Sequence, residues 1–211
     1  MEDIILVGFG GHARSVADSI ERQGKYTIIG YTDNEEHECC QYDYLGNDSV
    51  LEQLYNQGMH NAAICIGYLG NGSIREQIYR KLKSFGYEFP VIIDPSAIVS
   101  NNATIGEGTF IGKMAIINSN AKIGRMAIIN TKALIEHDCE VKEFTHIAVG
   151  TVLCGAVIVE RESFIGANAT ILQSLRIGYN SIIGAGAVVS KSIPNKCVVV
   201  GNPAKPIKVL E

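Results

Sequence analysis

The chain has 211 residues, of which 46% are hydrophobic and 19% are charged. This composition excludes a disordered chain and a coiled coil, and it supplies enough apolar side chains for a sizeable core. Eighteen basic against 22 acidic residues give a formal net charge of −4, so we expect no binding to nucleic acid, which favours basic proteins.

Three features of the sequence indicate where in the cell the protein is expected. No apolar run approaches the roughly 20 residues of a membrane helix, so we expect no membrane association. The acidic start, Met1-Glu2-Asp3-Ile4, lacks the positive charge of a secretory signal. The six cysteines form no Cys-x-x-Cys pair and no metal-ligand spacing. We therefore expect a cytoplasmic protein with free thiols and no metal.

Residues 1–95 predict a small parallel sheet with helices between its strands. Short apolar runs predict strands at residues 4–7, 27–31, 62–66 and 91–93. Helical spacing from Val16 to Ile20 ends at Gly24, and a second helix is expected near residues 73–85. Strands that alternate with helices are typical of an α/β fold with a parallel sheet.

A glycine-rich turn follows the first predicted strand. Gly8, Gly10 and Ala13 fit the pattern G-x-G-x-x-[GA], and Asp33 follows Ala13 by 20 residues, where a dinucleotide domain places its ribose-binding acid. The start of the following helix offers free N–H groups to a phosphate. A nicotinamide site normally spans two βαβ halves, and residues 1–95 supply little more than one. We interpret the turn as part of a mononucleotide-sized pocket.

Residues 98–193 divide into sixteen consecutive hexads without an insertion. The second position of each hexad is always aliphatic, and the sixth is Ala, Ser, Thr or Cys in thirteen of them. A period of six matches neither a helix nor simple strand alternation, and it indicates a solenoid. The aliphatic residue fills the interior, and the small residue fits where the chain turns a corner.

A second period of 18 residues places every third hexad on the same outer face. The outward stripes that begin at Ile98 and Phe110 are mainly apolar, whereas the stripe that begins at Thr104 is mainly polar. Continuous apolar stripes mark association surfaces, and a closed ring of identical three-sided prisms would cover two of them. We therefore expect a homotrimer.

The hexads and the closing segment of residues 199–205 resemble the left-handed parallel β-helix of the hexapeptide-repeat acyltransferases. Together with a Gly-Gly-His turn, a Tyr-Thr-Asp-Asn strand end and a Glu-His-Asp turn, they resemble the sialic-acid O-acetyltransferase-like sugar acetyltransferases over nearly the whole chain. That family includes N-acetyltransferases of nucleotide-linked 4-amino-4,6-dideoxy sugars, such as the bacillosamine-pathway enzyme. The resemblance implies a Rossmann-like nucleotide-sugar domain at 1–95, a β-helix acetyltransferase domain at 96–211, a homotrimer, and acetyl-CoA as co-substrate between adjacent β-helices.

His137 is the main candidate for chemistry. Its position in the hexad is a turn, so the residues alone allow either a solvated side chain or a base whose basicity the neighbouring Glu136 and Asp138 would raise. The resemblance implies that His137 is the general base and that Asp138 polarises it.

The resemblance also assigns binding residues. His146 interrupts an apolar stripe, so by itself it is an interface residue, a buried hydrogen-bonded histidine or a ligand contact. The resemblance favours contact with acetyl-CoA and adds three cofactor positions, Gly155, Ala167 and Ala185. It assigns the nucleotide sugar to Gly10, Gly11, His12, Asp33 and Asn34. The segment at residues 67–75 is longer than in relatives, so the resemblance does not determine that part of the sugar pocket.

These observations favour an acetyl-CoA-dependent N-acetyltransferase of a nucleotide-linked 4-amino sugar, acting in cell-surface polysaccharide synthesis. One alternative within the same class is O-acetylation of sialic acid or a related sugar. Two alternatives from other classes are an NAD-linked oxidoreductase that uses the glycine turn, and a scaffold without catalytic activity. The sequence leaves open which nucleotide is bound and whether an amine or a hydroxyl is acetylated.

Overall fold

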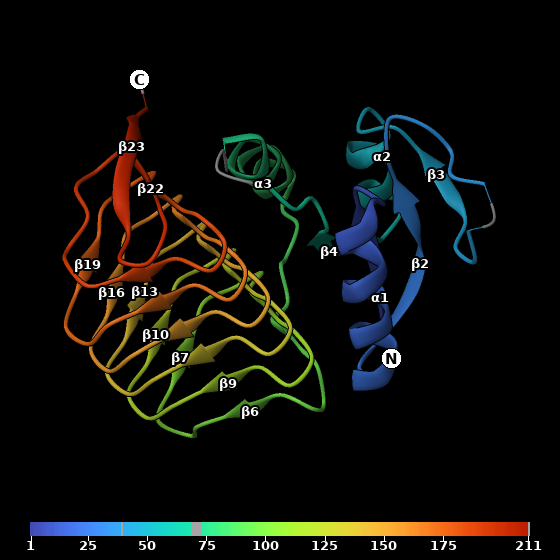
Figure 1. The fold of residues 1–211 in the computed structure, drawn as a ribbon. Coiled ribbons are helices and arrows are strands. Elements are labelled where there is room, and N and C mark those ends of the chain that lie inside the picture. Colours follow the sequence, from blue (N-terminus) through green and yellow to red (C-terminus); the bar gives the residue numbers. More distant parts are fainter. Residues whose placement is uncertain (39, 69–72, 211) are drawn as a thin grey trace. The chain divides into compact units, whose positions relative to one another are not determined.

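The computed structural model describes residues 1–38, 40–68 and 73–210. They form two compact units (Figure 1). The first comprises Met1–Gly67 and Ser73–Pro95, and the second comprises Tyr68 and the chain from Ser96 onward. Among these described residues, the structure contains no helix with the length and apolar character that crossing a membrane requires.

The first unit is built on a parallel sheet with the strand order β3-β2-β1-β4. Its strands and helices alternate as the sequence predicts, with two differences. Strand β3 and helix α2 were not expected, and β5, which the sequence predicted as a further strand of this sheet, is not part of it. The bounds are β1 (Glu2–Val7), α1 (Gly11–Gln23), β2 (Tyr26–Thr32), β3 (Tyr44–Gly46), α2 (Leu51–Asn56), β4 (Asn61–Ile64), α3 (Ser73–Phe85) and β5 (Ile92–Ile93).

Strand β1 is the centre of this sheet, and its residues Ile4, Ile5 and Leu6 are completely buried. The chain leaves β1 through Gly8, which has a φ of +85°. A Cβ atom on Gly8 would lie 2.5 Å from Cγ1 of Ile66, so only glycine fits there. Because β2 and β4 lie on opposite sides of β1, the turn after β1 lies where the strand order reverses, which is where open α/β sheets bind ligands.

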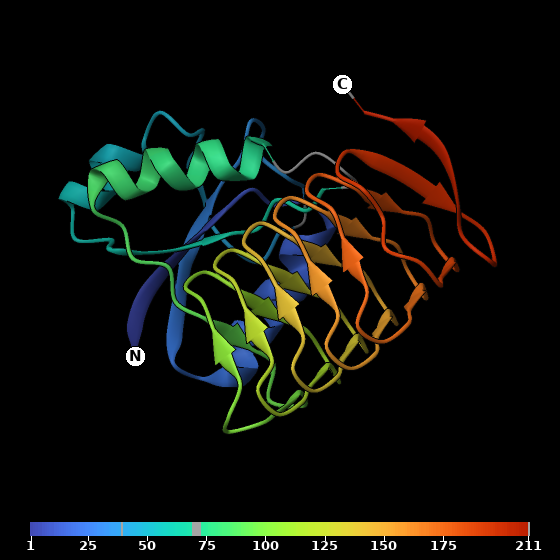
Figure 2. The same ribbon diagram turned by 90° about the vertical axis from the view of Figure 1, so that its left-hand side faces the viewer.

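The second unit is a left-handed parallel β-helix, as the hexads predict (Figure 2). Each strand pairs with the strand 18 residues further along, so that His146 lies between Ile128 and Phe164. The second hexad positions point inward, and Ile117, Ile135 and Leu153 are at most 1% exposed.

The stacked strands form the faces of this β-helix. The first face contains β6 (Ile98–Val99), β9 (Ile116–Ile117), β12 (Leu134–Ile135), β15 (Val152–Leu153), β18 (Thr170–Ile171) and β21 (Val188–Val189). The second contains β7 (Thr104–Ile105), β10 (Lys122–Ile123), β13 (Glu140–Val141), β16 (Ile158–Val159) and β19 (Arg176–Ile177). The third contains β8 (Phe110–Ile111), β11 (Ile128–Ile129), β14 (His146–Ile147), β17 (Phe164–Ile165), β20 (Ile182–Ile183) and β22 (Cys197–Val200), and β23 (Lys205–Val209) pairs antiparallel with β22.

The two apolar stripes differ in exposure, which the sequence did not predict. Ile98 is 65% exposed, but Phe110, Ile128 and His146 are 3%, 0% and 7% exposed within a single chain. Part of the reason is Tyr68, whose ring meets His146 edge-on at 5.6 Å between centroids. The start of the third face is thus already covered, and the first face remains the more exposed apolar surface.

Candidate active site

His137 and Asp138 lie in the turn between β12 and β13. Asp138 has a φ of +60°, a conformation that Asp and Asn tolerate better than most residues, and its N–H donates to the carbonyl of Ser119 at 3.0 Å. In this conformation Oδ2 of Asp138 lies 2.8 Å from Nδ1 of His137. The neutral imidazole therefore donates from Nδ1 to the carboxylate, and Nε2 carries the lone pair that can accept a proton.

The second oxygen of Asp138 is held by a residue that we did not identify from the sequence. Nδ2 of Asn120 donates to Oδ1 of Asp138 at 3.3 Å. Asn120 precedes Asp138 by one full coil of 18 residues, and it has the same φ of +60°. The regular coil length is the one sequence signal that could have brought this pair to attention.

The contacts of Asp138 shift the protonation of the pair. The hydrogen bond to Asp138 raises the pKa of His137 above its ordinary 6.5, and the negative charges of Asp138 and Glu136 act in the same direction. The hydrogen bonds from His137 and Asn120 lower the pKa of Asp138, which keeps it ionised. The His137 side chain is 62% exposed, so it is accessible to a substrate.

Gly155 lies one coil above His137, and the imidazole occupies the space beside it. A Cβ atom on Gly155 would lie 2.7 Å from both Cε1 and Nε2 of His137. The next N–H, that of Ala156, donates to the carbonyl of His137 at 2.9 Å. Gly155 thus stands next to the basic nitrogen rather than with the other expected cofactor residues.

Those other residues share a groove of about 390 Å³ on the third face. His146, Ala167 and Ala185, which the sequence assigned to the cofactor, all line it, together with Asn130, Ala148, Val149, Phe164 and Gly166. The lining is mostly small or apolar, so it can receive an extended, partly apolar ligand chain.

Both ring nitrogens of His146 are engaged, which decides its state. Nδ1 lies 2.9 Å from the carbonyl of Tyr68, which only accepts, so Nδ1 carries the proton. Nε2 then accepts from Nδ2 of Asn130 at 3.4 Å, and Oδ1 of Asn130 accepts from the N–H of Thr131. His146 is therefore a neutral, buried, hydrogen-bonded histidine that also lines the groove, and its contact with acetyl-CoA stays a prediction.

In the first unit, Asp33 ties the turn after β1 to the end of β2. Its Oδ2 accepts from the N–H of Phe9 at 2.7 Å and lies 3.1 Å from Nε2 of His37, while Oδ1 accepts from the N–H of Asn34. Burial by itself would raise the pKa of Asp33, but these hydrogen bonds outweigh it and lower the pKa. Asp33 is thus an ionised anchor for the glycine turn.

The remaining predicted substrate residues surround that turn. Gly10 and Gly11 stand at the start of α1, and a Cβ atom on either would meet nothing within 4 Å, so the space above them is open. His12 packs beside Gly67. Of the longer stretch at 67–75, residues 69–72 lie outside the described part of the chain. Arg75 is buried and donates to the carbonyl of Ile66 at 3.1 Å, just beyond β4, which ends at Ile64 rather than at residue 66 as the sequence predicted.

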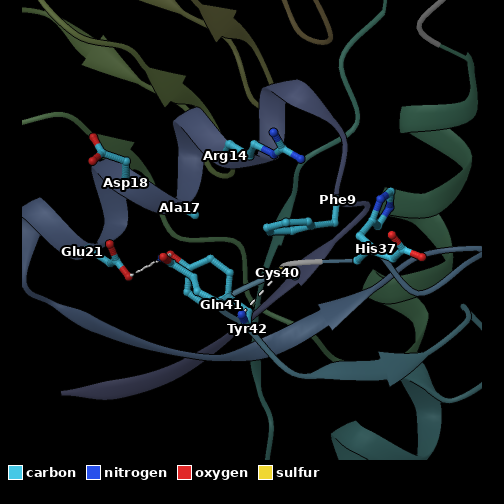
Figure 3. Close-up of a pocket in the computed structure, with 10 residues that line it drawn as sticks. Phe9, Arg14, Ala17, Asp18, Glu21, His37, Cys40, Gln41 and Tyr42 are labelled. Atoms are coloured by element: carbon cyan, nitrogen blue, oxygen red, sulfur yellow. Dashed lines mark hydrogen bonds between the residues drawn. The ribbon is translucent and has the colours of Figure 1, made fainter.

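A second cavity of about 540 Å³ lies between α1 and residues 37, 38 and 40–42 (Figure 3). It is lined by Phe9, Arg14, Ala17, Asp18, Glu21, His37, Glu38, Cys40, Gln41 and Tyr42. We did not predict this cavity from the sequence. The one signal is the spacing of the α1 residues, which follows a single helix face.

Comparison with known proteins now adds to this geometry. Residues 3–82 match the family described as PglD N-terminal domain, and residues 156–191 match the hexapeptide repeat of succinyl-transferase. PerB from Caulobacter crescentus, solved with CoA and GDP-perosamine, is 31% identical over 99% of this chain and 98% of its own, with a TM-score of 0.93. The chain belongs to the hexapeptide-repeat sugar acetyltransferase family.

Further relatives agree with this membership. The acetyltransferase domain of PglB from Neisseria gonorrhoeae is 32% identical over 98% of this chain and 100% of its own, with a TM-score of 0.92. A curated Staphylococcus aureus protein, 2,3,4,5-tetrahydropyridine-2,6-dicarboxylate N-acetyltransferase, is 44% identical over 71 residues, which are 30% of either chain. This chain therefore matches less than a third of the length of those curated relatives.

Family membership confirms the expected fold, a Rossmann-like parallel sheet followed by a left-handed β-helix. The described residues contain no cluster of three or more His, Cys, Asp or Glu side chains that could hold a metal ion. The hexapeptide-repeat chain thus presents a histidine–carboxylate pair beside a glycine, a groove lined by small residues, and a glycine turn next to a larger cavity.

Proposed function

We propose that this chain is an acetyl-CoA-dependent acyltransferase that acetylates the amino group of a nucleotide-linked sugar, specifically the 4-amino group of a 4-amino-4,6-dideoxy sugar. The observation that carries the proposal is the His137–Asp138 pair, with its basic Nε2 beside Gly155. PerB, solved with CoA and GDP-perosamine, and the PglB domain, solved with acetyl-CoA, support the choice of both substrates. Because acetyl-CoA and nucleotide sugars are cytoplasmic metabolites, we place the reaction in the cytoplasm, within cell-surface polysaccharide synthesis.

In this mechanism His137 is the general base. The sugar nitrogen attacks the acetyl carbonyl while Nε2 of His137 takes one of its protons, and the ionised Asp138 stabilises the resulting imidazolium through Nδ1. The tetrahedral intermediate collapses, the carbon–sulfur bond breaks, and the CoA thiolate receives the proton. The N–H of Gly155, which has no acceptor among the described residues, lies beside the ring and can donate to the developing oxyanion.

The groove on the third face is the proposed site for the acetyl-CoA chain. The side chains of Ala167 and Ala185 are small and leave room in the groove for a ligand. The neutral His146 presents no charge to an apolar chain. Gly155 would meet the thioester, and the turn at Gly10, Gly11 and His12 would meet the nucleotide sugar, with Asp33 and Asn34 behind it.

We also propose that the active form is a homotrimer. The stripe that begins at Ile98 continues through Ile116, Leu134 and Val152, which are only half-buried, and such a stripe is typical of an association surface. Neighbouring copies would then cover the exposed His137 and close the site against water. Light scattering should give three times the chain mass at micromolar concentration, and a monomeric mass would contradict the trimer.

Thiol release from acetyl-CoA tests the function directly. The assay compares UDP-, dTDP- and GDP-linked 4-amino sugars with free and CMP-linked sialic acid, and mass spectrometry locates the acetyl group. We expect turnover with a nucleotide-linked amino sugar, an amide in the product, and turnover at least about 10²-fold slower in the His137→Ala variant. Turnover confined to the sialic acids would instead favour sugar O-acetylation.

A further inference from the structure

The cavity beside α1 is a built space that the reaction chemistry above does not use. Arg14, Ala17, Asp18 and Glu21 line it from one face of α1, and residues 37, 38 and 40–42 line the other side (Figure 3). Phe9, which lines it, stands between Gly8 and Gly10 in the turn that would meet the nucleotide phosphates. A nucleotide held there would direct its base along α1.

The lining carries charges of both signs: Arg14 is basic, and Asp18, Glu21 and Glu38 are acidic. The guanidinium of Arg14 makes no hydrogen bond or ion pair with any residue that the structure describes. Glu21 lies seven residues further along α1, about 10 Å along the helix axis. Figure 3 shows Arg14 on one side of the opening and Glu21 with Tyr42 on the other, with the small Ala17 between them.

Glu21 is exposed, and two hydrogen bonds orient one of its carboxylate oxygens. Its Oε1 accepts from the hydroxyl of Tyr42 at 2.8 Å and from Nε2 of Gln41 at 3.3 Å. Burial and the hydrogen bond to Glu21 raise the pKa of Tyr42 to about 12, so the phenol remains a donor at neutral pH. Both bonds end on Oε1, which leaves Oε2 without a donor among the described residues.

A guanine base matches this arrangement. Its O6 and N7 accept side by side, as a guanidinium requires, and its N1–H and N2 amino group donate side by side, as a carboxylate requires. Uracil and thymine present carbonyl oxygens on both sides of a single N–H, and a carboxylate repels these. Adenine lacks the O6 acceptor.

We propose that this cavity binds the nucleobase of the sugar nucleotide and selects guanine, with Arg14 recognising the O6 and N7 edge and Glu21 accepting from the N1 and N2 edge through Oε2. The proposal rests on the proposed function, because it assumes that the substrate is a nucleotide sugar. It adds which nucleotide is used and which residues read it.

Isothermal titration of the full-length protein with GDP, UDP, dTDP and CDP, without acetyl-CoA, tests the proposal. GDP should bind at least 10-fold more tightly than UDP or dTDP. Arg14→Ala should weaken GDP binding on the order of 10-fold, about the value of one bidentate pair. Glu21→Gln should weaken it by a smaller factor, because only Oε2 is open to the base. Both variants should change UDP binding little. Lys25→Ala, which removes an exposed positive charge just beyond α1, is the matched control and should leave GDP binding unchanged.

Three results would overturn the proposal. Equal affinity for all four diphosphates would show that the base is not read. If Arg14→Ala weakened the binding of all four diphosphates equally, Arg14 would contact the phosphates and not the base. Unchanged GDP affinity in both variants would place the base elsewhere. Because binding is measured apart from transfer, acetylation of a UDP-linked amino sugar would refute guanine selection and leave the proposed function intact, whereas selective GDP binding without any acetyl transfer would do the reverse.

Discussion

The imidazole of His137 lies where a side chain at position 155 would have to be. A Cβ atom on Gly155 would stand 2.7 Å from both Cε1 and Nε2 of the ring, closer than real side chains approach. The φ of Gly155 is outside the left-handed region, so its backbone would accept another residue. Glycine is therefore needed at position 155 to leave space for the His137 ring, and not to allow an unusual backbone conformation.

Gly155→Ala should displace the His137 ring and lower kcat by at least about 10-fold, because a misplaced catalytic group loses much of its rate advantage. The melting temperature should change little, since the backbone conformation allows alanine. Gln173→Ala, one coil further along in the same column and exposed, is the control and should keep the activity of the wild type. A Gly155→Ala enzyme with unchanged kcat would show that the ring position is unimportant.

His137→Ala should lower kcat by roughly 10²- to 10⁴-fold, the usual contribution of a general base. Added imidazole should restore part of the rate by entering the vacated space. The matched control is His60→Ala, which removes an exposed histidine of the first unit. Wild-type turnover in His137→Ala would end the assignment of this residue as the base.

Asp138→Asn should move the acid limb of kcat/KM to lower pH. The base must be neutral, so activity falls as the pH drops through the pKa of His137, and Asp138 raises that pKa. Removing the carboxylate charge lowers the pKa of His137, so the enzyme stays deprotonated to a lower pH, although the weaker base reduces the maximal rate. The pH profiles of the two enzymes check the sign, and an acid limb that moves upward would contradict the assigned pair.

The β-helix could be predicted because one rule repeats along it. Inward residues such as Ile117 and Leu153 come every six positions, and the backbone pairs only with neighbouring coils. The first unit was harder. Strand β3 has only three residues and lies at the edge of the sheet, and α2 buries only Leu51, so neither leaves a periodic apolar pattern.

The candidate site divides in the same way. His137 and Asp138 are adjacent in the sequence, so their contact could be expected, and the resemblance supplied Gly155. Asn120 resembles any solvated turn residue until the coil length is used to align it with Asp138. The cavity beside α1 depends on residues 37, 38 and 40–42 lying opposite the helix, which no local pattern encodes.

Asn120→Asp tests whether the carboxylate of Asp138 is held for catalysis or only for the turn. Asp keeps the size of Asn and tolerates its φ of +60°, so the fold should be retained. The new charge would stand beside Asp138 and near His137, and a further negative charge raises the pKa of the imidazole. The acid limb of kcat/KM should therefore move to higher pH, opposite to the shift expected for Asp138→Asn. Asn102→Asp, one coil further from His137 in the same column, should leave the profile unchanged, and identical profiles for both variants would reduce Asn120 to a turn residue.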